Sequence, residues 1–130
     1  MGNDEISSNE PKLKKTFDLE ERTAKFGEQI IKFAGKINLN PVTRSLIGQL
    51  VNAGTSVGAN YCEANDAFSK KDFAHKISIC RKEAKESKHW LRMIWGVQPG
   101  LLSEAKVLWQ EAQELNLIFS SILRKTRTKL

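Results

Sequence analysis

One stretch of the chain decides the fold: residues 69–95 read SKKDFAHKISICRKEAKESKHWLRMIW. Ser69, with Asp72 three residues later, is a typical helix start. From there apolar and small residues recur at steps of four and three, which is the spacing of one helix face. These residues are Phe73, Ile77, Cys80, Ala84, Ser87, Leu91 and Ile94. The spacing predicts one long amphipathic helix that ends before Pro99 and Gly100.

Three further segments repeat this spacing on the two sides of that stretch. The first is predicted to begin with a capping box of Asp18 and Glu21. The second follows the cap Asn40 and runs to about Asp66, and the last follows the cap Ser103. Their inward positions are Leu19, Thr23, Phe26, Ile30, Phe33 and Ile37; then Leu46, Leu50, Ala53, Val57, Asn60 and Ala64; and then Ala105, Leu108, Ala112, Leu115, Phe119 and Ile122.

These four segments predict the fold class and the domain organisation. Short connections between long helices force consecutive helices to run antiparallel. The prediction is therefore an all-α protein, an antiparallel up-down-up-down four-helix bundle over residues 18–126. We expect a flexible N-terminal arm over residues 1–17 and a basic C-terminal tail over residues 127–130.

Small residues fill the middle of the second predicted helix. Gly48, Gly54 and Gly58 lie inside it, and each interior glycine costs roughly 1 kcal/mol relative to alanine. A helix that keeps three glycines is expected to have a neighbouring backbone close by. We interpret these glycines as packing positions rather than as a ligand site.

The two cysteines and the hydropathy of the chain indicate a cytoplasmic protein. Cys62 and Cys80 are predicted to lie in or near the core, about 10 Å out of register along facing helices, which is too far for a disulfide. No run of about 18 apolar residues is present, so neither a signal peptide nor a membrane-spanning helix is expected.

No residue set indicates catalysis. Glu86 and His89 form an E-x-x-H pair of the kind that holds paired metal ions in ferritin-like bundles, but such a site needs a second pair on another helix. The other histidine, His75, lies on the same predicted helix. No phosphate-binding glycine loop follows the glycines of the second helix. We therefore predict no enzymatic activity and no cofactor or metal.

Basic residues form a ridge on the third predicted helix, and the formal net charge of the chain is +6. The ridge keeps the spacing of the core stripe but lies on another side of the helix, and more cations follow near the C-terminus. Such ridges suit the phosphate backbone of nucleic acids, although a solvated face threaded with Glu83 and Glu86 is an equal alternative. The predicted nucleic-acid-binding residues are Lys71, His75, Lys82, Lys85, His89, Arg92, Arg124, Lys125 and Arg127.

A second group of polar residues is predicted to be buried or half-buried between the second and third helices. It comprises Gln49, Asn60, Glu63, Arg81 and Glu86. Unpaired buried polar groups are costly, so we expect these side chains to bond to one another or across a subunit boundary.

Part of this group belongs to a longer resemblance. Residues 49–64 read QLVNAGTSVGANYCEA, and SKKDF and ICRKEAKE follow at residues 69–73 and 79–86. Over residues 19–126 the chain resembles the S23-type four-helix bundle family, named for proteins encoded in intervening sequences of bacterial 23S ribosomal RNA genes. The family pattern Q-L-x-x-x-x-x-S-x-x-x-N-x-x-E-G maps onto Gln49, Ser56, Asn60 and Glu63. Ala64 replaces its glycine, which indicates a divergent branch.

The resemblance implies partners. Family members look like barrel-shaped homopentamers, and a relative, the accessory variability determinant of diversity-generating retroelements, binds nucleic acid and a reverse transcriptase. Self-assembly also has support from aromatic and sulfur-containing side chains that exceed what one bundle needs to hide. These residues are Trp90, Met93, Trp95 and Trp109.

Together these observations predict a non-enzymatic, oligomeric helical bundle that binds RNA or DNA backbones. Its expected partners include a nucleic-acid enzyme such as a reverse transcriptase, and no membrane is involved. The alternative is a protein-protein interaction scaffold without nucleic-acid binding. A metal-dependent bundle enzyme is a more distant alternative.

Overall fold

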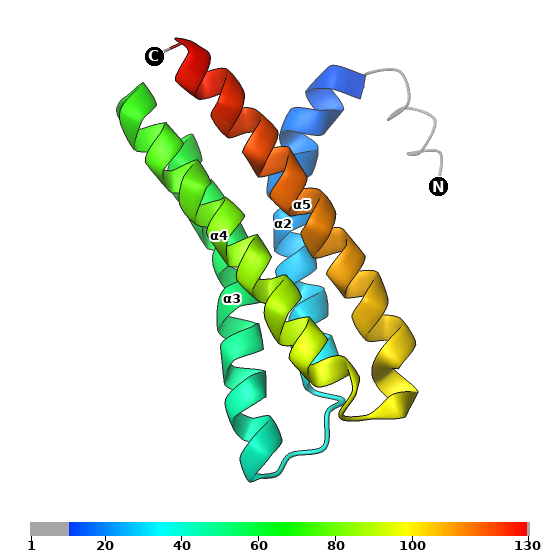
Figure 1. The fold of residues 1–130 in the computed structure, drawn as a ribbon. Coiled ribbons are helices and arrows are strands. Elements are labelled where there is room, and N and C mark those ends of the chain that lie inside the picture. The colour runs from blue at the N-terminus through cyan, green and yellow to red at the C-terminus, as the bar shows by residue number, and fades with distance from the viewer. Residues whose placement is uncertain (1–10, 130) are drawn as a thin grey trace.

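The computed structural model describes the backbone of residues 11–129 and the side chains of residues 19–127 (Figure 1). Four long helices account for most of this part of the chain: α2 (Pro11–Ala34), α3 (Pro41–Asn65), α4 (Lys70–Trp95) and α5 (Leu102–Lys129). A single 3-10 turn, η1 (Pro99–Leu101), precedes α5. The predicted all-α class is confirmed. None of these helices is both long and apolar enough to span a membrane.

The helices follow one another around the bundle in chain order. Each packs against the next, and α5 returns to a less extensive contact with α2. Consecutive helices run in opposite directions (Figure 1). Short connections force this antiparallel order. Each pair of neighbouring helices therefore meets along a seam, and side chains from both helices line the surface there.

The core confirms most of the predicted stripes. The five inward positions on α2, Ile37 just after it, and six of the seven on α4 are buried. The exceptions are Leu46, Asn60, Phe73 and Ile122, which are half-buried. Thr43 and Tyr61 of α3 and Leu123 of α5 are also buried, although they were not among the predicted inward positions. The ring centroids of Tyr61 and Phe119 lie 6.1 Å apart.

The helix starts are confirmed in two of four places. Asn40 caps α3, its side chain accepting hydrogen bonds from the amides of Val42 and Thr43 at 2.9 and 3.0 Å. The hydroxyl of Ser69 accepts one from the Asp72 amide at 3.0 Å and caps α4. Both caps accept hydrogen bonds from amides of the first helical turn, which have no carbonyl partner within the helix.

The other two starts were wrong. Helix α2 begins at Pro11, so Asp18 lies inside it and residues 11–17 are helical rather than irregular. Proline is favoured at a first helical position, and the leucine and lysines that follow are good helix formers. Ser103 lies inside α5 because the turn at Pro99 runs directly into that helix. The predicted basic tail is helical through Lys129, and the arm over residues 1–10 lies outside the described residues.

Two of the three glycines of α3 meet α2 closely. A Cβ atom at Gly54 would lie 2.8 Å from Cγ1 of Ile30, and one at Gly58 would lie 3.3 Å from the backbone of Thr23. Gly48 has nothing within 4 Å of that position. The predicted close packing is therefore confirmed at Gly54 and Gly58 and was wrong at Gly48.

Candidate nucleic-acid interface

The predicted ridge lies on the solvent side of α4. Its six basic residues are two positions out of step with the buried stripe, which turns them to the opposite side of the helix. All six are exposed: Lys71, His75, Lys82, Lys85, His89 and Arg92. The structure thus places these residues in one line that a large anionic ligand can reach.

Beside the ridge, α4 and α5 enclose a basic groove of about 570 Å³. We call it the α4–α5 groove, and it is lined by Ser78, Arg81, Lys82, Lys85, Lys88, Asn116 and Ser120. Four of these seven side chains are cationic and none is acidic. Its hydroxyl and amide groups can also donate hydrogen bonds, so the lining matches the needs of phosphate oxygens.

Hydrogen bonds hold the two walls of the groove together. The Asn116 side-chain amide donates to the carbonyl oxygen of Arg81 at 3.1 Å, and the Lys88 ammonium donates to the side-chain oxygen of Gln113. The four cations of the groove form no ion pair with any side chain of residues 19–127. The groove cations therefore keep their charge available for an external anion.

Two tryptophans lie at the end of the groove nearest η1. The rings of Trp95 and Trp109, both half-buried, have centroids 6.3 Å apart. The Lys88 ammonium lies 4.8 Å from the Trp109 centroid, and the Arg92 guanidinium and Lys106 ammonium each lie 5.7 Å from the Trp95 centroid. Because Lys88 also lines the groove, the aromatic pair and the groove form one continuous surface.

The predicted C-terminal cations are on α5. Arg124, Lys125 and Arg127 are exposed. Arg124 and Arg127 follow Ser120 of the groove at steps of four and three, so they continue its wall toward the end of the helix. The structure therefore extends the basic surface along α5 rather than into a separate tail.

The acidic residues of α4 lie on its other flank. Lys76 pairs with Glu63 of α3 at 2.6 Å, and Glu83 lies two helical turns beyond Lys76 on the same side. Burial raises the pKa of Glu83, and the nearby Glu86 carboxylate raises it further. Glu83 therefore lies toward α3, Glu86 is exposed to solvent, and no carboxylate lines the α4–α5 groove.

The predicted polar network does not form within the chain. Gln49, Glu63 and Glu86 are exposed, so the expectation that they are buried was wrong. The half-buried residues bond elsewhere: Ser56 donates to the Asn52 carbonyl at 2.6 Å, Asn60 donates to the Ser56 carbonyl at 2.9 Å, and the Arg81 carbonyl accepts from Asn116. Bonding across a subunit boundary remains a prediction.

No metal cluster is formed by the side chains that the structure describes. Glu86 and His89 are both exposed, and the His89 ring packs against Trp90 at 4.8 Å. No group of three or more His, Cys, Asp or Glu residues among the described positions lies close enough to hold an ion.

The cysteines differ in environment. Cys80 is buried, and burial raises the pKa of its thiol to about 12, which keeps it protonated and unreactive at neutral pH. Cys62 is exposed, so the expectation that it lies in or near the core was wrong. Both thiols are free.

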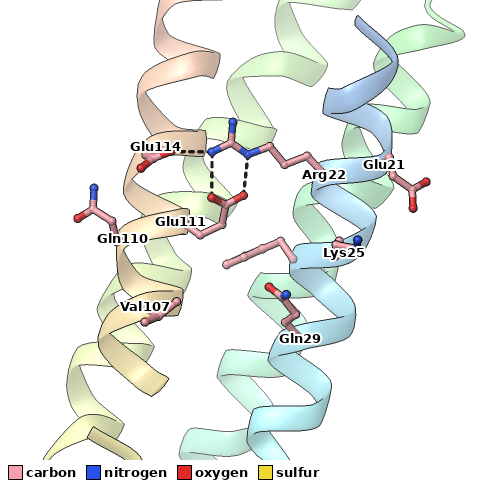
Figure 2. Close-up of a pocket in the computed structure, with 9 residues that line it drawn as sticks. Glu21, Arg22, Lys25, Gln29, Val107, Gln110, Glu111 and Glu114 are labelled. Carbon is pink, nitrogen blue, oxygen red and sulfur yellow. Dashed lines mark hydrogen bonds and ion pairs between the residues drawn. The ribbon is translucent and has the colours of Figure 1, made fainter. Parts of the chain in front are cut away.

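A second hollow, of about 520 Å³, lies between α2 and α5 (Figure 2). The Arg22 guanidinium donates to both carboxylate oxygens of Glu111 at 2.7 and 2.9 Å and to Glu114 at 2.7 Å (Figure 2). The hydrogen bond to Glu111 is the main cause that raises the pKa of Arg22. Two carboxylates surround this cation, so the cluster joins α2 to α5 and Arg22 is already paired with protein carboxylates.

The sequence reasoning missed much of the groove. Arg81, Lys88 and Trp95 are spaced by seven residues along α4, and that spacing alone would have placed them on one flank. The residues of α5 could be assigned to the same site only from the register between α4 and α5. These residues are Lys106, Trp109, Asn116 and Ser120.

Comparison with known proteins agrees with this fold. The family model described as 23S rRNA-intervening sequence protein matches residues 15–121. A solved structure of a protein with unknown function from the S23 ribosomal protein family, from Bacteroides thetaiotaomicron, is 25% identical, with a TM-score of 0.70. The match covers 81% of this chain and 97% of the Bacteroides chain. No curated protein matches the chain.

Proposed function

Because the chain belongs to the family of 23S rRNA-intervening sequence proteins, we propose that it is a non-enzymatic accessory protein that binds the backbone of RNA or DNA. One observation carries this proposal: the α4–α5 groove brings Arg81, Lys82, Lys85 and Lys88 together without a carboxylate among its lining residues. Cations without acidic partners attract phosphates strongly, because no internal ion pair has to be broken first.

Salt dependence tests this proposal directly. Each phosphate contact lowers log K by about 0.7 to 0.9 per unit of log salt concentration, so four contacts predict a loss of about 50- to 150-fold between 50 and 200 mM salt. Fluorescence anisotropy with labelled single-stranded RNA, structured RNA and duplex DNA measures this loss. Binding that ignores salt would contradict phosphate contacts, and no binding to any of the three would favour the protein-scaffold function.

We further propose that the chain is a homo-oligomer, a pentamer by resemblance to its family. Trp90 and Met93 of α4 support this proposal, because Trp90 is half-buried and Met93 is 43% exposed. Trp90 follows Lys76 by 14 residues, so it lies on the same flank, which faces α3. Ser56 and Asn60 of the family pattern are half-buried on α3. A mixed face of this kind suits an interface between copies.

Light scattering tests the assembly. We expect the wild type to have a mass several times that of the 14.7 kDa chain, and Met93→Glu to lower it toward that of the monomer, because a charge at an interface is desolvated without a partner. Leu117→Glu is the matched control, since Leu117 is 56% exposed on α5. An unchanged mass for Met93→Glu would remove this face from the interface.

The remaining part of the proposal concerns a protein partner. An oligomer with one basic surface per subunit can hold a nucleic acid near an enzyme that acts on it, such as a reverse transcriptase. Support for this role comes from the family resemblance and from the basic surface that the structure forms.

A further inference from the structure

The α4–α5 groove differs from a plain phosphate site because it ends at an aromatic pair. Trp95 and Trp109 are half-buried and lie under three cations, Lys88, Arg92 and Lys106. A groove that only followed a phosphate backbone would need the cations alone. Indole rings that adjoin such a groove offer flat surfaces on which unpaired bases can stack.

The groove has the length for a short strand. Three contacts join α4 to α5 along it: Arg81 with Asn116, Lys88 with Gln113, and Trp95 with Trp109. From Arg81 to Trp95 the axis of α4 rises about 21 Å, at 1.5 Å per residue. At about 3.4 Å per nucleotide of a stacked strand, this distance accommodates roughly six nucleotides.

We propose that the α4–α5 groove selects single-stranded nucleic acid, with phosphates on Arg81, Lys82, Lys85 and Lys88 and with unpaired bases stacked on Trp95 and Trp109. This inference rests on the proposed function and adds the class of ligand. A duplex keeps its bases stacked inside, so it can use the cations but not the indoles. Lysine and arginine side chains over the rings can move aside or remain as partners of the bound base.

An abasic strand separates the two contributions. Anisotropy compares a labelled thymidine 12-mer with an abasic 12-mer that has the same number of phosphates, on the wild-type protein at one salt concentration. Stacking predicts that the thymidine strand binds at least about tenfold more tightly, while both strands show the same salt dependence. Equal affinities would overturn the single-strand inference and leave backbone binding intact. If neither strand binds, the proposed function fails and the inference fails with it.

A matched pair of variants locates the stacking. Trp109→Leu is expected to bring the thymidine strand to within about twofold of the abasic strand and to leave the abasic strand unchanged. Phe68→Leu is the control, because Phe68 is an exposed aromatic residue in the turn between α3 and α4, at the other end of α4 from Trp95, and it should keep the full difference. If Trp109→Leu keeps the difference, the inference is overturned. Circular dichroism verifies the fold of each variant, and the wild-type comparison decides the question even if a variant unfolds.

Discussion

Replacing Lys82, Lys85 and Arg92 together by glutamate is expected to weaken nucleic-acid binding at least about 100-fold at 50 mM salt. These residues are exposed, and two of them line the α4–α5 groove. Each replacement removes a phosphate contact and adds a repelling charge. The slope of log K against log salt should become shallower by about one for each lost contact, which anisotropy at several salt concentrations measures.

Net charge alone could also weaken binding, so a second triple variant provides the control. Lys25, Lys32 and Arg44 are exposed on α2 and α3. Reversing either set of three charges brings the formal net charge from +6 to zero. If binding follows the position of the charges, the control variant should keep most of the affinity and the full slope. Equal losses in both variants would show that the groove has no special role.

Gly54→Ala is expected to lower the free energy of unfolding by about 1 to 3 kcal/mol. The added methyl group would lie 2.8 and 2.9 Å from the two γ-carbons of Ile30, which is completely buried. Isoleucine is branched at Cβ and has few alternative rotamers, so it cannot move aside easily. Urea denaturation of the purified protein measures the change.

Gly48→Ala provides the comparison on the same helix. Nothing lies within 4 Å of the Cβ position there, so the substitution should raise the free energy of unfolding by about 0.5 to 1 kcal/mol through helix propensity. Destabilisation by both substitutions would mean that the close approach of α2 is not the reason for glycine at position 54.

The sequence predicted those parts of the fold that periodicity and local capping determine. The α4 stripe from Ile77 to Ile94 is buried as expected, because an unbroken alternation of four and three leaves one possible inward face. The cap at Asn40 was predicted because its hydrogen bonds reach only to Val42 and Thr43. The start at Ser103 was wrong because a cap signature cannot exclude a preceding proline turn.

The candidate site combines residues of α4 that the sequence singled out with residues of α5 that it did not. Exposure of the ridge followed from its offset to the core stripe, so Lys82 and Lys85 could be identified. The contribution of α5 depends on register across the pair of helices, which no local pattern in the sequence contains. For the same reason Gln49 and Glu86 were expected to be buried or half-buried between the second and third helices, whereas both are exposed.

The weak seam between α2 and α5 affects the kinetics of the fold. Helices that are neighbours along the chain make most of the contacts, and proteins with such local contacts fold in microseconds to milliseconds. The ion cluster of Arg22, Glu111 and Glu114 joins the first helix of the bundle, α2, to the last, α5. It can form only after the chain between these two helices has closed into a loop. Interactions that form after the transition state slow unfolding and hardly change the folding rate. We therefore expect the ion cluster to slow the opening of the bundle and to change the rate of its assembly little.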